Sequence, residues 1–288
     1  MIRTLSIVVL LGLVLCDESS ASSIAYAKVK MGRTVAHTVT VNLADPQVRV
    51  TVALAKGGAG SSESFKSIVR RVHPAAAITG TFFDTKTLIP TGDIALFGTV
   101  VHSGCIGSAL CIDHENKASV VPIRKGRQQK WAGYETVLCA GPTLVAKGKV
   151  AIALKHEGFR RSLCAPARRT AVGITKAGKL LIVAINRDAS LYQIAKVMVK
   201  LHTVDAVCLD GGSSTGFYHD GRFLAMPSRS LTNCLLVYAT PADYRMAKSE
   251  LAPARLFASA ETLTLEELFS NIPLAIGNAF APLPVRGR

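Results

Sequence analysis

The chain has 288 residues, of which 49% are hydrophobic, and it carries a formal net charge of +15. This length and composition indicate a globular protein with a sizeable core. The charge favours anionic partners, although a generally solvated basic surface is the alternative. No RNP, zinc-finger or helix-turn-helix pattern is present, so we expect no nucleic-acid partner.

The first 27 residues have the pattern of a secretory signal peptide. Arg3 precedes an apolar run from Leu5 to Leu15, and a polar stretch then ends in Ala25-Tyr26-Ala27. Cleavage is expected after Ala27. Because the apolar run is shorter than the roughly 20 residues that a spanning helix needs, we expect no membrane span in the mature chain. The sequence thus predicts an exported protein, either periplasmic or secreted.

Seven cysteines occur in the chain, and six of them follow residue 27. An even number of cysteines in an exported protein predicts disulfides. The pairs expected are Cys105–Cys111 and then Cys139–Cys164, with Cys208 and Cys234 as buried thiols or a third bridge. The seventh, Cys16, gives the alternative of a lipoprotein acylated at that residue.

The predicted elements begin with two segments of alternating polarity. Residues 34–43 and 48–55 place apolar side chains at every second position, which predicts a hairpin around residues 44–47. Helical spacing of apolar residues from Phe65 to Val72, behind candidate N-cap serines, predicts a short helix that ends at Pro74.

Strands dominate the rest of the predicted domain. They are expected within residues 75–84, 90–104, 130–150, 168–186, 204–210 and 231–239, with a hairpin around residues 176–178 and an amphipathic helix over 190–201. We therefore predict an α+β fold, a single mixed, strand-rich sheet with a few packed helices, over residues 28–240. Residues 241–288 are expected to form a partly disordered appendage with a weak helical piece at 262–269.

The stretch DAVCLDGGSSTGFYHDG, from Asp205 to Gly221, contains the main functional signal. Asp210 ends an apolar run, and a charge at the tip of a buried strand costs free energy unless it is paired, hydrated or used. The simplest explanation is a turn in which Asp210 caps backbone N–H groups. No serine elbow, Walker loop or zinc pattern accompanies it. No cofactor is predicted, although Asp188 and Asp210 are a candidate pair for a divalent cation.

Six motifs in chain order resemble the phosphodiester glycosidase family, here as a bacterial exported member. They are AITGTFFD, PTGDIALFGTVV, GPTLVAKGKV, RTAVGITKAGKLLIVAINR, DAVCLDGGSST and RSLTNCLLVY, and they span about residues 33–240. The most specific is Leu209-Asp210-Gly211-Gly212 with the two serines that follow. The resemblance implies a mixed α/β domain that hydrolyses a sugar-1-phosphodiester in a glycan or envelope polymer.

The resemblance also implies the site residues. The catalytic residues would be Asp210, Arg169 and Arg229, and the substrate-binding residues would be Thr79, Gly80, Phe83, Gly211, Gly212, Ser213, Ser214 and Asn233. One residue departs from the family pattern, because Thr79 stands where members typically have Asn. A metal is not implied.

The chemistry of these residue types agrees with that assignment. Phosphate is a good leaving group, so charge stabilisation matters more than general-acid help, and arginine suits it. Asp210 would support an oxocarbenium-like centre or activate water. Each residue also has a structural alternative: Asp210 could cap its loop, Arg169 could pair across the sheet, and Asp84 or Asp93 could be turn residues or a second carboxylate. Thr79 makes a non-catalytic, basic glycan-binding protein the alternative function.

Overall fold

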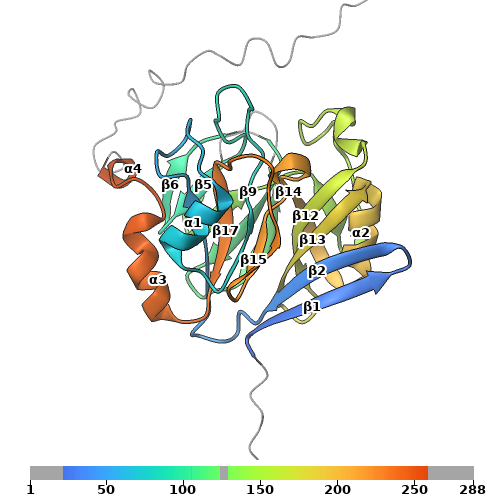
Figure 1. Cartoon of the computed structure of the whole chain (residues 1–288), viewed down its shortest axis with the longest axis horizontal. Coiled ribbons are helices and arrows are strands. Elements are labelled where there is room, and N and C mark those ends of the chain that lie inside the picture. Colours follow the sequence, from blue (N-terminus) through green and yellow to red (C-terminus); the bar gives the residue numbers. More distant parts are fainter. Residues whose placement is uncertain (1–21, 105, 124–128, 259–288) are drawn as a thin grey trace, which may run out of the picture.

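Three antiparallel sheets form the framework of the protein, and helices cover its outside (Figure 1). The computed structural model describes residues 22–104, 106–123 and 129–258. The largest sheet has seven strands in the order β1 (Ile24–Met31), β2 (Thr34–Val41), β13 (Leu180–Ala189), β12 (Ala167–Thr175), β14 (Thr203–Leu209), β10 (Thr143–Ala146) and β11 (Lys149–Val150).

Two five-stranded sheets complete the framework. One has the order β16 (Arg222–Ala225), β15 (Phe217–His219), β4 (Ala76–Thr79), β17 (Asn233–Tyr238) and β3 (Arg49–Leu54). The other has the order β6 (Thr99–His102), β5 (Ile94–Leu96), β9 (Tyr134–Cys139), β7 (Ser108–Asp113) and β8 (Ala118–Pro122).

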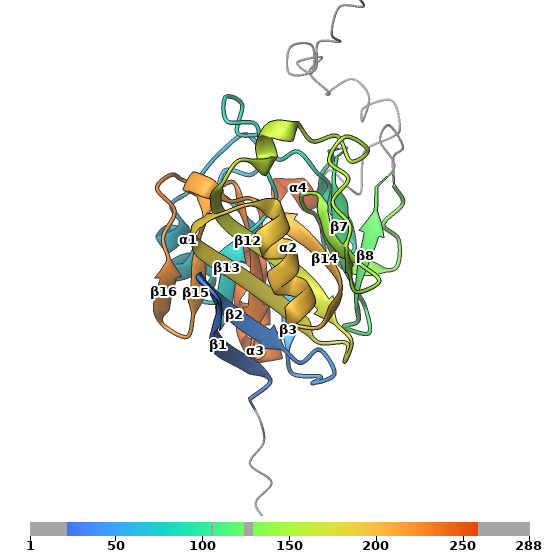
Figure 2. The same cartoon turned by 90° about the vertical axis from the view of Figure 1, so that its right-hand side faces the viewer.

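The helices are short and lie on the outside of the sheets. The α-helices are α1 (Phe65–Val72), α2 (Leu191–Lys200), α3 (Pro241–Ala247) and α4 (Arg255–Ala258), and the 3-10 turns are η1 (Arg161–Cys164), η2 (Gly212–Ser214) and η3 (Lys248–Glu250). Figure 2 shows α2 across the seven-stranded sheet, against β12, β13 and β14. It connects β13 to β14, which lie on either side of β12.

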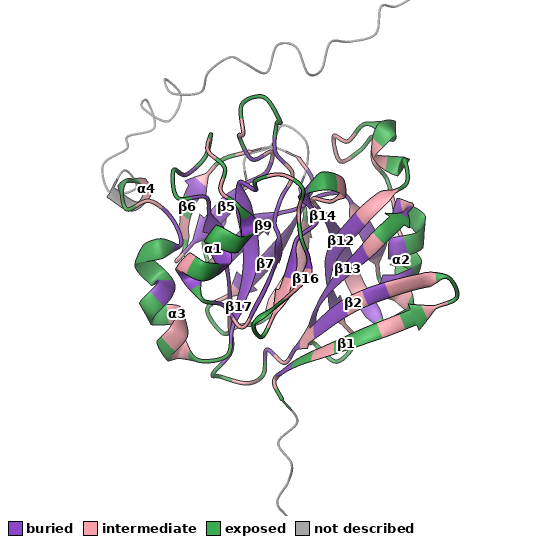
Figure 3. Cartoon of the chain, in the orientation of Figure 1, coloured by how far each residue is buried: buried purple, intermediate pink, exposed green. Residues whose placement is uncertain are grey.

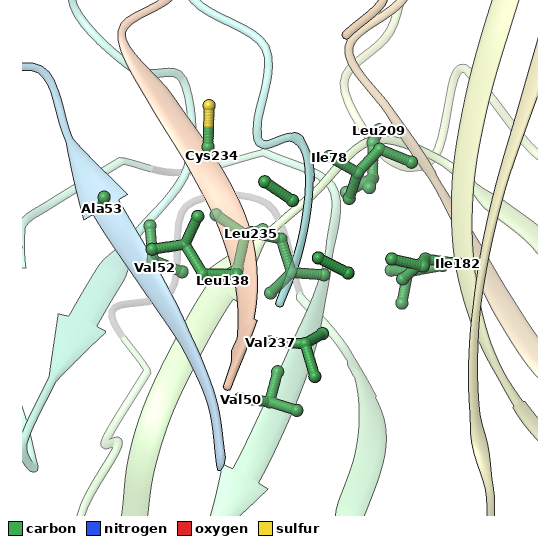
Figure 4. Close-up of a cluster of buried hydrophobic side chains, with 14 of the residues drawn as sticks. Val50, Val52, Ala53, Ile78, Leu138, Ile182, Leu209, Cys234, Leu235 and Val237 are labelled. Carbon is green, nitrogen blue, oxygen red and sulfur yellow. The ribbon is translucent and has the colours of Figure 1, made fainter. Parts of the chain in front are cut away.

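One core joins the three sheets. Its fully buried side chains include Val52 on β3, Leu138 on β9 and Leu209 on β14, one from each sheet (Figure 4). Figure 3 shows the burial concentrated on the inner strands, while the outer faces of α1 and α3 are exposed. Because Leu209 is held in this core, the next residue, Asp210, is fixed at the core's edge.

Several elements confirm the sequence-based predictions. The helix behind the serines is α1, with Ser64 as its N-cap and a left-handed C-cap at His73. The hairpin around residues 176–178 is β12–β13, and the amphipathic helix is α2, which begins with a capping box at Ser190. Here local spacing and capping chemistry agree with the tertiary structure.

The prediction of a single mixed sheet is wrong. There are three sheets, and the strand pairs within the described residues are antiparallel. The predicted hairpin of 34–43 with 48–55 is also wrong, because β2 and β3 belong to different sheets. β2 instead pairs along its whole length with β1, in the register Ile24↔Val41 to Met31↔Thr34. Alternating polarity indicates a strand but does not identify its neighbour.

The described structure includes residues on both sides of 28–240, the range expected for the domain. At the N-terminus, cleavage after Ala27 would remove half of β1, including the buried Ile24. At the C-terminus, Leu251 is fully buried in the core and its carbonyl accepts a hydrogen bond of 2.8 Å from the N–H of Leu54. The segment after residue 240 therefore contributes a side chain to the core. Residues 1–21, with Cys16, and the predicted helical piece at 262–269 lie outside the described residues.

The five cysteines in the described part of the chain are free thiols. The predicted Cys139–Cys164 bridge is wrong, because Cys139 is buried in β9 whereas Cys164 is exposed in η1. The Cys105–Cys111 prediction involves Cys105, which lies outside the described residues. Burial raises the pKa of Cys208 to about 12, which suits a packed thiol. Among the described residues, no helix combines the length and apolar character that a membrane span requires.

The β1 strand predicts a measurable difference between two N-termini. A chain that begins at Ser22 keeps β1 whole, whereas one that begins at Lys28 loses the burial of Ile24 and half of the β1–β2 ladder. We expect the shorter chain to be less stable by roughly 2–4 kcal/mol in urea unfolding. Equal stability of the two chains would show that the first half of β1 is dispensable.

Candidate active site

Asp210 follows β14 directly and is held from two sides through its backbone. Its N–H donates a hydrogen bond of 3.0 Å to the carbonyl of Gly80, which follows β4. Its own carbonyl accepts a hydrogen bond from the hydroxyl of Thr170 on β12. The residue is thus fixed where the seven-stranded sheet meets the sheet that contains β4.

The Asp210 carboxylate accepts hydrogen bonds from the loop that follows it. Oδ1 accepts the N–H of Gly211 at 2.9 Å, and the hydroxyl of Ser214 also donates to the carboxylate. Burial raises the pKa of Asp210 to about 6, although these bonds and the nearby Arg229 favour the ionised form. Half-buried carboxyls with such a raised pKa are common at functional sites.

Arg229 brings a positive charge to the same place. Its guanidinium lies over the ring of Phe83, with Cζ 4.7 Å from the ring centroid, and Phe83 is largely buried. The loop that contains Arg229 is tied to the loop after Asp210, because the N–H of Ser228 donates to the carbonyl of Ser213 at 2.9 Å. A stacked guanidinium keeps its planar edge free to bind an anion.

Arg169 has a different environment from Arg229. Its side chain is buried, and its Nε donates to the carbonyl of Ala189 at 2.9 Å. Its Nη2 donates to the carbonyls of Leu163, at 2.9 Å, and Ala165. These bonds fasten the η1 segment to β12 and β13. A direct contact between Arg169 and phosphate stays a prediction, and the pairing with a carboxylate across the sheet is not what the structure shows.

Arg168 is the residue of this site that the sequence analysis missed. Its Nε donates to the carbonyl of Gly212 and its Nη1 to the carbonyl of Met226, both at 3.0 Å. It therefore joins the Asp210 loop to the Arg229 loop. Gly211 allows this close packing, since a Cβ there would lie 2.6 Å from the Arg168 carbonyl oxygen. The double arginine in RRTAVGI was the available signal, but a pair of arginines does not show which one faces the loop.

Thr79, Gly80 and Asn233 support the site from beneath. The Thr79 hydroxyl donates to the Ser214 carbonyl and accepts the N–H of Gly216 at 2.8 Å. Asn233 Oδ1 accepts the N–H of Thr81 at 2.8 Å, and a Cβ on residue 80 would lie 1.9 Å from this oxygen. Thr79 and Asn233 are both about 1% exposed, so they shape the loops that carry Asp210.

The other acidic candidates are occupied elsewhere. Asp84 accepts the N–H groups of Lys86 and Thr87 in an exposed turn, and these bonds lower its pKa. Asp93 accepts the N–H of Gly104 at 2.7 Å and the indole N–H of Trp131 at 2.6 Å. Asp188 is exposed on β13. No group of three or more metal-ligating side chains occurs among the described residues.

Comparison with known proteins identifies the family to which this arrangement of sheets and loops belongs. The chain matches the phosphodiester glycosidase family model over residues 73–238, more than half of its length. The protein therefore belongs to the phosphodiester glycosidase family. A search of curated proteins found no match.

Solved structures share the fold at low sequence identity. A hypothetical protein from Synechocystis aligns with a TM-score of 0.64 and 17% identity, over 74% of this chain and 61% of that one, so the chain spans less than two thirds of it. The catalytic domain of zebrafish N-acetylglucosamine-1-phosphodiester alpha-N-acetylglucosaminidase, auto-inhibited by its pro-peptide, aligns with a TM-score of 0.61 and 21% identity, over 76% and 85%. A Burkholderia pseudomallei protein, described as a candidate exported protein, aligns with a TM-score of 0.57 and 14% identity, over 71% and 74%.

The buried hydroxyl of Thr79 gives a prediction about stability. Thr79→Val should lower the free energy of unfolding by about 1–3 kcal/mol, because the Ser214 carbonyl and the Gly216 N–H lose their shared partner. Thr79→Ser is the matched control, since it keeps the hydroxyl and removes one methyl, at a cost of about 1 kcal/mol. Urea unfolding of both variants is the measurement, and equal stability of the two would contradict the role given to the hydroxyl.

Proposed function

We propose that the protein is an exported hydrolase that cleaves a sugar-1-phosphodiester bond in a glycan or envelope polymer. The observation that carries this proposal is the pairing of Asp210, a half-buried carboxylate with a raised pKa, with the stacked guanidinium of Arg229. The Asp210 carboxylate suits a developing positive charge, and the Arg229 guanidinium suits phosphate. Membership of the phosphodiester glycosidase family supports the same reaction class.

The proposed reaction breaks the bond between the anomeric carbon and the phosphate oxygen. Water supplies the new oxygen on the anomeric carbon, and the phosphate monoester leaves with the electron pair of the broken bond. The proton from water passes to Asp210 or to solvent. In its ionised form, Asp210 stabilises the oxocarbenium-like transition state or acts as the base for water.

Arg229 holds the phosphate in this proposal. Its guanidinium offers paired N–H donors in one plane, and stacking on Phe83 fixes that plane. Gly211, Gly212 and the exposed Ser213 form the rim of the site and supply further donors to the phosphate. Arg168 and Arg169 act as positioning residues, because their guanidinium groups hold backbone carbonyls around the site.

Export is part of the same proposal. The apolar run from Leu5 to Leu15 supports a signal peptide, and the intact β1 favours cleavage before Ile24. The small residues Ser19 and Ala21 provide a compatible site after Ala21. Substrates in this location would be phosphate-bearing glycans of the envelope or its surroundings.

Asp210→Asn separates a catalytic from a capping role. Turnover on a sugar-1-phosphodiester should fall by about 10²-fold or more, because Asn cannot supply the negative charge. Since the wild-type reaction needs the ionised carboxylate, its kcat/KM should rise with pH and reach half its maximum near pH 6. Purified protein is assayed against a panel of sugar-1-phosphodiesters to find the substrate first.

Although Asp210→Asn is expected to lower turnover, we expect it to raise the stability of the folded protein. The pKa of Asp210 is higher in the folded than in the unfolded state, so the folded protein binds the extra proton and loses stability as pH rises from about 4 to about 6. Asp210→Asn avoids this cost and should be more stable than the wild type at pH 7 by about 1–3 kcal/mol. A loss of stability of about 1–2 kcal/mol with normal turnover would instead identify a capping residue.

Arg169 and Arg229, the two arginines that the family resemblance implies, are expected to differ in the effect of substitution by lysine. Arg229→Lys should lower kcat/KM by about tenfold or more, because a point charge cannot form a bidentate phosphate contact, and should change stability by less than about 0.5 kcal/mol. Arg169→Lys should destabilise the fold by about 2–4 kcal/mol, because the carbonyls it holds lose donors. Kinetics and urea unfolding of both variants are compared, and the reverse pattern would make Arg169 the phosphate ligand.

A further inference from the structure

A basic groove lies between α1 and the β15–β16 hairpin, away from the Asp210 loop. Its volume is about 340 Å³, and the residues that line it include Lys66, Arg70, His73, Tyr218 and Phe223. Both views of the fold place α1 beside this hairpin (Figures 1 and 2). No acidic side chain is among the residues that line the groove.

Three basic side chains form one stripe along α1. Lys66, Arg70 and His73 are exposed and follow one another at spacings of four and three residues, next to the buried stripe of the helix. Arg71 contrasts with them, because it forms an ion pair of 2.7 Å with Glu63. In the described part of the chain, neither Lys66 nor Arg70 belongs to an ion pair.

Helix stability accounts for Arg70 but not for the whole stripe. Cations near the C-terminus of a helix interact favourably with its dipole, which suits Arg70 in the last turn. Lys66 lies in the first turn, where a cation opposes the dipole and where α1 has no acidic residue. The positive charge of the groove therefore favours an external anion as its partner.

Two aromatic rings, inclined to each other by 54°, give the groove an apolar wall. The centroids of Tyr218 and Phe223 are 5.1 Å apart, and both residues are partly exposed. The Tyr218 hydroxyl accepts the N–H of Gly221 at 3.0 Å, which fixes the ring. Phe223 also packs edge-on against Phe65 at 5.9 Å. Fixed aromatic faces pack against the apolar faces of sugar rings, while cations bind phosphate.

The hairpin connects this groove to the candidate active site. Tyr218 follows Ser214 by four residues, so it lies at most about 13 Å along the chain from the Asp210 loop. The other strand, β16, leads from Phe223 to the loop that contains Arg229. One ligand chain could therefore run beside the hairpin from the groove to Asp210.

We propose that this groove binds a further phosphate-bearing saccharide unit, so that the substrate is a polymer with repeated sugar phosphates. The saccharide would pack on Tyr218 and Phe223, and its phosphate would lie between Lys66 and Arg70. This inference rests on the proposed function for its link to catalysis, but binding at the groove can be measured without turnover.

The test uses the full chain with Asp210→Asn, which is expected to slow cleavage of the probe during the measurement. The probe is a hexamer of N-acetylglucosamine joined by 1-phosphodiester bonds, and its Kd is measured by calorimetry with and without Lys66→Glu and Arg70→Glu. We expect the double change to weaken binding by about tenfold or more, because two phosphate contacts become repulsive. Thermal unfolding verifies that the variants fold, and Lys66→Gln with Arg70→Gln replaces the Glu pair if they do not.

A matched control comes from α2. Lys196→Glu with Lys200→Glu makes the same change of net charge at the same spacing on another exposed helix. We expect this control to change the Kd by less than about twofold, since charges far from the ligand are screened. If it weakens binding as much as the Lys66 and Arg70 changes, the effect is general electrostatics and the groove proposal is overturned.

Two further arms complete the test. In chains that retain Asp210, the Lys66 and Arg70 changes should leave cleavage of a diester with a single phosphate unchanged, while reducing cleavage of the hexamer. If the hexamer binds through the groove but the wild type does not cleave it, the proposed function is overturned and the groove proposal stands. Unchanged hexamer binding, or equally tight groove-dependent binding of a single-stranded DNA 12-mer, would overturn the assignment to a phosphorylated saccharide.

Discussion

The hydrogen bond from the N–H of Asp210 to the carbonyl of Gly80 joins two sheets at the place where the proposed chemistry occurs. Leu209 holds one side of this contact in the shared core, and the Asn233 side chain shapes the turn on the other side. Asn233 occupies the space that a side chain at position 80 would need, so only glycine fits there. The position of the carboxylate is therefore a consequence of how two sheets meet.

Placing the Asp210 carboxylate at this position lowers the stability of the folded protein. A carboxylate at the edge of the core is poorly solvated, and the raised pKa of Asp210 reports that cost. The Ser214 hydroxyl, the Gly211 N–H and the charge of Arg229 offset part of it. The surroundings of a capping residue would be expected to favour its ionised form, whereas a carboxylate whose ionised form is disfavoured by burial suits a group that acts on substrate.

Local sequence patterns predicted α1, α2, the β12–β13 hairpin and the loop of Asp210, because spacing and capping determine such elements over a few residues. The partners of β2 and β3 could not be predicted in this way, since residues 24–27, the first half of β1, were assigned to a signal peptide and alternation does not specify neighbours. The structural role of Arg169 could not be predicted from the sequence either. Its partners are backbone carbonyls of η1 and β13. Every residue has a backbone carbonyl, so the sequence does not show which ones Arg169 binds.

In the proposed reaction, Asp210 and Arg229 act on opposite sides of one sugar-phosphate bond. A crystal structure of the Asp210→Asn protein with an intact sugar-1-phosphodiester would show whether they do. We expect the phosphate to contact the guanidinium of Arg229 above Phe83, with the anomeric carbon facing residue 210. A ligand whose phosphate contacts neither Arg229 nor the loop of residues 211–214 would contradict it.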